Sequence, residues 1–124
     1  MEDLYYLTKT DMELEDIAAC AEEFGYRHYY VTRAYRDLVI HYSEDDHCRW
    51  AKLEKDKLAL EDYEREQMSE LQPSSIFMIN YHATSLPKLV DFLKRILERH
   101  GGVGCDEDWR VNYTIDNIDD LQCP

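Results

Sequence analysis

The chain has 124 residues, 44% of them hydrophobic, so it can bury one core and is not a disordered tail. Its 27 acidic residues outnumber its 14 basic residues, and the formal net charge of −13 disfavours direct binding to nucleic acid or to an anionic membrane. A surface of this sign favours association with a basic protein instead. We therefore expect a single domain, residues 1–124, with a basic protein as its partner.

The first residues, MEDLYYLTKTDMELE, are acidic where a secretory signal has a basic stretch followed by an apolar one. No apolar run approaches the roughly 18 residues that a membrane span needs. These features predict a cytoplasmic protein that does not cross a membrane. In that compartment the thiols are expected to stay reduced, with Cys20 in the core. The four cysteines are Cys20, Cys48, Cys105 and Cys123.

Hydrophobic periodicity predicts the secondary structure in chain order. The predicted elements are a strand at 4–8, a helix at 11–24, strands at 26–32, 37–42 and 47–53, a helix at 57–71, a central strand at 76–81, a helix at 85–100, a strand at 109–115 and a turn or single helical turn at 116–121. Thr10 and Glu13 fit a capping box for the first helix, and Ser85 fits the cap of the third. Gly25 and the pair Gly101-Gly102 are placed to end helices.

The pattern is typical of an α+β domain with a mainly antiparallel sheet and about three helices. The order strand, capped helix, glycine, strands occurs over residues 4–42 and recurs over 76–115. This repeat raises the hypothesis of two similar β-α-β-β halves.

The stretch HGGVGCDEDW, residues 100–109, has the composition of an active-site loop. Cys105 is its candidate nucleophile, with His100 nearby as a base and glycine amides as oxyanion donors. Two features disfavour this chemistry. The loop follows the negative end of a helix, and Asp106 and its two acidic neighbours add more negative charge, whereas a reactive thiolate needs an electropositive setting. The glycines also follow a helix, whereas phosphate-binding loops precede one.

A metal site is the other catalytic alternative. His47 and Cys48, joined by Cys105 or Cys123, supply zinc-type ligands, but their spacing does not predict that they converge. The acidic run at 116–120 lacks the glycine and the distal glutamate of a calcium-binding EF-hand loop. We expect no cofactor.

Arg27, Arg33 and Arg36 lie among several tyrosines, but this basic-aromatic patch competes poorly for phosphate on so acidic a chain. The ten tyrosines suit a protein-binding surface as well as a core.

The sequence favours a non-catalytic inhibitor that covers the basic active site or substrate groove of a partner. Carboxylates pair with lysine or arginine in this hypothesis, and Trp109 is the apolar anchor. The size and charge are similar to those of bacterial toxin-immunity (antitoxin) proteins. The candidate contact residues are Glu44, Asp45, Asp46, Asp106, Glu107, Asp108, Trp109, Asp116, Asp119 and Asp120.

Three alternatives remain open. One is a phage anti-defence protein that mimics nucleic acid, of the anti-restriction or anti-CRISPR kind. Another is an enzyme that depends on a cysteine or a metal. The third is a homo-oligomeric or ligand-binding regulatory domain whose tyrosines line a pocket.

Overall fold

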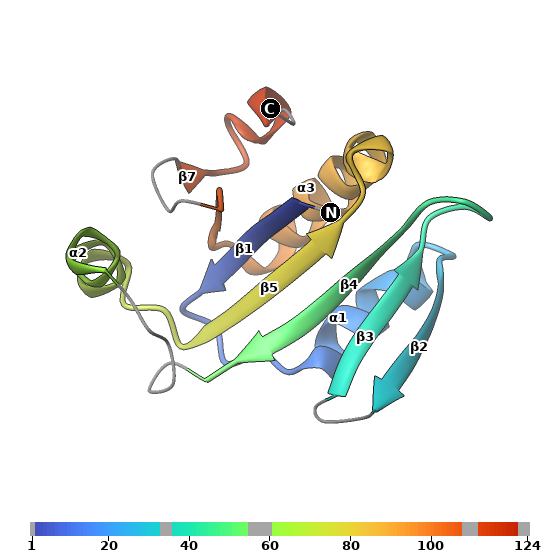
Figure 1. Ribbon diagram of the computed structural model, residues 1–124, viewed down its shortest axis with the longest axis horizontal. Coiled ribbons are helices and arrows are strands. Elements are labelled where there is room, and N and C mark those ends of the chain that lie inside the picture. The colour runs from blue at the N-terminus through green and yellow to red at the C-terminus, as the bar shows by residue number, and fades with distance from the viewer. Residues whose placement is uncertain (1, 33–35, 55–60, 108–111, 122–124) are drawn as a thin grey trace.

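The computed structural model of the chain describes all residues except 1, 33–35, 55–60, 108–111 and 122–124. Its described part is an α+β domain with an antiparallel sheet in the order β2-β3-β4-β5-β1-β6-β7 (Figure 1). The elements are β1 (Glu2–Thr8), α1 (Leu14–Glu23), β2 (Arg27–Thr32), β3 (Arg36–His41), β4 (His47–Leu53), α2 (Asp62–Leu71), β5 (Ser75–Tyr81), η2 (Ala83–Ser85), α3 (Leu86–His100), β6 (Val103–Cys105), β7 (Asn112–Tyr113) and η3 (Ile118–Asp120). The predicted fold class and the central position of the 76–81 strand are confirmed.

The main core lies between one face of the sheet and helices α1 and α3. Its centre is aromatic: the Trp50 ring meets the rings of Tyr6, Phe77 and Phe92 at centroid distances of 6.3, 6.0 and 5.9 Å. Cys20, predicted to be a core residue, is 4% exposed. Among the described residues, no helix is long and apolar enough to cross a membrane.

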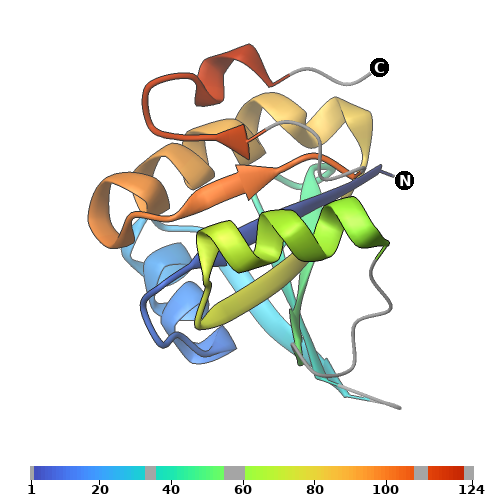
Figure 2. The same cartoon turned by 90° about the vertical axis from the view of Figure 1, so that its left-hand side faces the viewer.

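Helix α2 covers the opposite face, but only over β5, β1 and β6. Met68 of α2 packs there against Leu7, Ile76 and Cys105. Figure 2 shows α2 crossing in front of β1. The other half of this face, over β2, β3 and β4, carries no helix in the part of the chain that the structure describes.

The predicted start of the first helix is wrong. Glu13 and Asp16 form the capping box, and the Glu13 N–H donates to Asp16 Oδ2 at 2.8 Å. The reason is a long-range contact. The N–H of buried Met12 donates to Ser75 Oγ at 2.8 Å, which holds the chain before Glu13 at the start of β5 and delays the helix.

Three other boundaries differ from the prediction. Ser85 makes no side-chain cap to α3, because its hydroxyl donates to Asp46 instead. In the predicted strand 109–115 the described part contains only the short β7, and 109–111 lie outside the described residues. Helix α2 begins at Asp62, after its N-cap Glu61, and the predicted helical residues 57–60 lie outside the described residues.

The glycines end helices as predicted. The Gly25 N–H donates to Glu22 and the Tyr26 N–H to Ala21, a paired closure that needs the positive φ of 80° at Gly25.

Candidate functional site

The predicted contact residues gather mostly at one end of the sheet. Glu2 pairs with Tyr81 and Tyr81 with Cys48, so β1 begins, β5 ends and β4 begins at this end. β6 also runs toward it, because it is antiparallel to β1. In Figure 1 the start of β1, the end of β5 and the β3–β4 turn lie at the upper-right ends of their strands, and the red segment that contains η3 lies above them. We name this the carboxylate end; its acidic residues are Glu44, Asp45, Asp46, Asp106, Glu107, Asp119 and Asp120.

The β3–β4 turn is fixed to the start of α3 through Asp46. Its carboxylate accepts hydrogen bonds from Ser43 Oγ at 2.9 Å and Ser85 Oγ at 3.3 Å, and it pairs with Lys88 Nζ at 3.3 Å. The hydrogen bond from Ser43 and the ammonium of Lys88 lower the pKa of Asp46. Asp46 therefore holds the turn in place, while Glu44 and Asp45 remain exposed.

η3 lies along the other side of α3. Ile118 and Leu121 are buried in the main core, and Asp119 Oδ2 pairs with Lys94 Nζ at 2.8 Å on the surface. Asp120 is exposed. The two lysines of α3 thus tie the two acidic segments to one helix.

The acidic segment after β6 completes the end. Burial raises the pKa of the Tyr113 phenol, and the negative charges of Asp106 and Asp120 raise it further. Both carboxylates therefore lie near this one ring, which connects the β6 segment to η3. Glu107 is exposed, and Asp116 is exposed in the turn before η3. Asp108 and Trp109 lie outside the described residues.

An apolar groove of about 480 Å³ runs between α3 and η3 at this end. Carboxylates of Asp91 and Asp119 border it. Its apolar lining consists of Ala83, Leu86, Pro87, Val90 and Leu121. The groove was not foreseen from the sequence, because η3 comes to α3 only through the tertiary fold.

The thiols occupy settings that oppose nucleophilic chemistry. Burial raises the pKa of Cys48 and of Cys105 from 9.0 to about 12, and it raises that of Cys20 as well. Cys105 is fully buried; its thiol donates to Asn112 Oδ1 at 2.9 Å, and it lies 3.7 Å from Gln67 Nε2. This thiol ties β6, β7 and α2 together, which is a structural role.

Of the candidate metal ligands, His47, Cys48 and Cys105 do not converge, and Cys123 lies outside the described residues. Neighbouring residues on a strand point to opposite faces, so Cys48 enters the main core while His47 faces the open half of the sheet. Cys105 lies under α2, in the second core cluster. The described residues contain no group of three His, Cys, Asp or Glu side chains placed to hold a metal ion.

The basic-aromatic patch is partly neutralised. Arg36 pairs with Glu15, and its guanidinium lies over the Tyr30 ring, 4.8 Å from the centroid. Arg33 lies outside the described residues.

Sequence reasoning missed a row of histidines on the open half of the sheet. His41, His47 and His82, which we name the imidazole row, come from β3, β4 and the end of β5. Ring centroids of His41 and His47 are 5.3 Å apart, and those of His47 and His82 are 5.7 Å apart. The sequence did contain a signal for this pair. His41 and His47 stand directly before and after the turn at 42–46, and the β3–β4 register places them opposite each other.

Comparisons of the chain with models of protein families, with curated proteins and with solved structures gave no match.

Proposed function

We propose that this protein is a non-catalytic inhibitor of the toxin-immunity kind, which binds a basic nuclease-like toxin through its carboxylate end and blocks the toxin's active site or substrate groove. The observation that carries the proposal is that three acidic segments of the chain lie at one end of the sheet, where η3, the last of them, borders an apolar groove on α3. Exposed carboxylates take the positions of substrate phosphates, and the groove receives an apolar side chain of the toxin. Interfaces of this composition combine charge steering with a desolvated anchor.

The thiols support a non-catalytic role. A cysteine enzyme needs an accessible thiolate near neutral pH, and Cys48 and Cys105 are both buried with a pKa of about 12. A nucleic-acid-binding defence enzyme is also a suitable partner for the carboxylate end. The experiment below therefore distinguishes between the two kinds of partner.

The test measures affinity for a basic toxin encoded beside this gene. The variant Glu44→Gln/Asp45→Asn/Asp120→Asn removes exposed charges from the carboxylate end and leaves Asp46 and Asp119 in their structural ion pairs. Three exposed ion pairs of roughly 0.5 kcal/mol each amount to about a tenfold loss of affinity.

The matched control is Glu22→Gln/Glu66→Gln/Glu70→Gln, which removes the same charge from exposed sites on α1 and α2. We expect it to lose less than about threefold, mostly through slower association. Equal losses in the two variants would mean that net charge alone governs binding. Tight binding of a DNA-binding defence enzyme, with none to the toxin, would replace the immunity role with the anti-defence one.

A further inference from the structure

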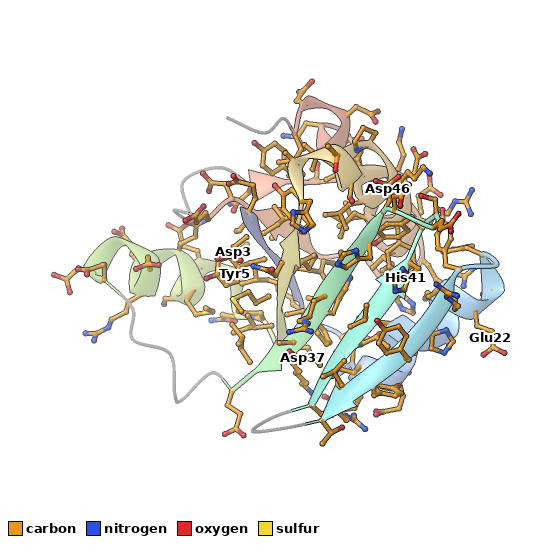
Figure 3. All side chains as sticks on the ribbon, turned by 45° about the vertical axis from the view of Figure 1, so that its right-hand side comes forward. Asp3, Tyr5, Glu22, Asp37, His41 and Asp46 are labelled. Carbon is orange, nitrogen blue, oxygen red and sulfur yellow. The ribbon has the colours of Figure 1, made fainter. Side chains whose placement is uncertain are left out.

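The open half of the sheet carries a cleft that is separate from the groove at the carboxylate end. Its volume is about 290 Å³. Its lining residues are Tyr29, Val39, His41, His47, Arg49, Asn80 and His82. Figure 3 looks toward this side of the sheet, with His41 and Asp37 on β3 and Asp46 at the carboxylate end. The cleft thus brings together side chains from β2, β3, β4 and the end of β5.

The side chains in the cleft are rich in hydrogen-bond donors. Arg49 is exposed, and its Nε lies 3.7 Å from Asp37 Oδ2, a loose ion pair that leaves much of the guanidinium open to solvent. His47 and His82 have no hydrogen-bond partner among the described residues, so their ring nitrogens are open to a ligand. The phenol of Tyr29 lies 3.4 Å from His41 Nε2.

The two nearby carboxylates contact donors of the protein, although Asp37 Oδ1 is buried without a hydrogen-bond partner. Asp37 is 8% exposed and faces Arg49. Asp3, at the far side of the same face, accepts a hydrogen bond from Asn80 Nδ2 at 2.6 Å. Arg27, which pairs with His41 across β2 and β3, and Glu44 of the neighbouring turn line a second pocket together with His41. The net character of the cleft is therefore that of a donor site within an otherwise acidic surface.

The surroundings of His41 disfavour its protonated form. His41 Nδ1 is buried without a hydrogen-bond partner, so a proton placed there meets no acceptor. Burial lowers the pKa of His41, and the charges of Arg27 and His47 lower it further. His41 therefore favours its neutral form, and Arg49 supplies positive charge to the cleft.

We propose that this cleft binds an oxyanion, the phosphate or carboxylate group of a small ligand, between Arg49 and the imidazoles of His47 and His82. Arginine and protonated histidine are the side chains that form charge-assisted hydrogen bonds to such groups. A volume near 290 Å³ is at the small end of ligand sites and suits one charged group with a short attachment. Because the chain carries a net charge of −13, binding depends on these local donors.

The test uses sulfate as the tetrahedral probe, because its charge is constant over the range in which imidazoles titrate, and acetate as the planar carboxylate probe. Both are titrated into the whole protein while the ring proton signals of all five histidines are followed by NMR. At about pH 6 we expect sulfate or acetate to move the signals of His47 and His82, with binding about tenfold tighter at about pH 5.5 than at about pH 8. Two histidines outside the cleft are internal controls. They are His28, which lies opposite Ile40 on the other face of the sheet, and His100, the last residue of α3.

A response to sulfate alone identifies a phosphate-type ligand, and a response to acetate alone identifies a carboxylate. The variant Arg49→Gln is expected to weaken binding about tenfold, whereas Arg65→Gln, at an exposed site on α2, is expected to leave it unchanged. Equal movement of all five histidines reports general ionic screening and overturns the proposal, as does an absence of any movement. If Arg49→Gln does not fold, the histidine signals of the unaltered protein still show whether the cleft binds the probe.

Discussion

The reactivity of Cys105 toward iodoacetamide tests the buried-thiol interpretation of the HGGVGCDEDW stretch. Burial first, and the charge of Asp106 second, raise the pKa of this thiol from 9.0 to about 12. Three pKa units lower the thiolate fraction about a thousandfold at any pH below 9. A more basic thiolate is intrinsically more nucleophilic, which raises the rate constant of the thiolate itself by a factor of roughly 16 to 32. The net expectation is alkylation slowed at least about thirtyfold, before any hindrance from burial.

The assay compares alkylation of each cysteine, read by mass spectrometry, in the native protein and in urea. Cys48, whose pKa is also raised to about 12, is expected to be protected alongside Cys105. Native alkylation of Cys105 within about threefold of its unfolded rate would refute the reasoning and restore thiol catalysis as a hypothesis.

Two further predictions concern stability and are read from urea unfolding. Gly102 has φ of 90°, and a Cβ added there contacts the Leu7 carbonyl oxygen, so Gly102→Ala should cost about 3 kcal/mol. Gly25 also has positive φ but open space around it, so Gly25→Ala should cost only about 1 kcal/mol, and equal costs would contradict the close approach. Burial raises the pKa of Asp37 despite Arg49, so the native protein loses stability as the carboxyl ionises. Asp37→Asn should therefore stabilise the protein at pH 7 by up to about 1 kcal/mol, with the gain vanishing near about pH 3; a loss at pH 7 would show that the ion pair dominates.

Local patterns predicted most of the fold. Alternation and helical spacing identified the strands and helices, and Gly25 marked the end of α1 because a left-handed residue is needed there. The start of α1 was missed because Ser75, far along the chain, holds Met12. The position of α2 could not be predicted from the sequence either, because the apolar stripe of a helix does not determine which face of a sheet the helix covers.

The candidate site was predictable in composition but not in arrangement. The acidic clusters are visible in the sequence. Which of their members form an ion pair depends on Lys88 and Lys94 of α3, which only the fold brings to Asp46 and Asp119. Predicting the imidazole row from the sequence would have required knowing two strand registers. The β3–β4 register pairs His41 with His47 across a short turn, whereas the position of His82 depends on the β4–β5 register, which joins segments separated by α2.

The most direct test of the proposed function is protection of cells from a basic, nuclease-like toxin, which is sought first among the genes beside this one. We expect co-expression of this protein to restore growth, and a binding assay with purified proteins to give a complex that weakens as salt is raised, because charge pairs contribute to it. The variant Glu44→Gln/Asp45→Asn/Asp120→Asn should protect less well than the matched control Glu22→Gln/Glu66→Gln/Glu70→Gln. Growth that is not restored, together with no complex at low salt, would contradict the assignment of the carboxylate end as a toxin-binding surface.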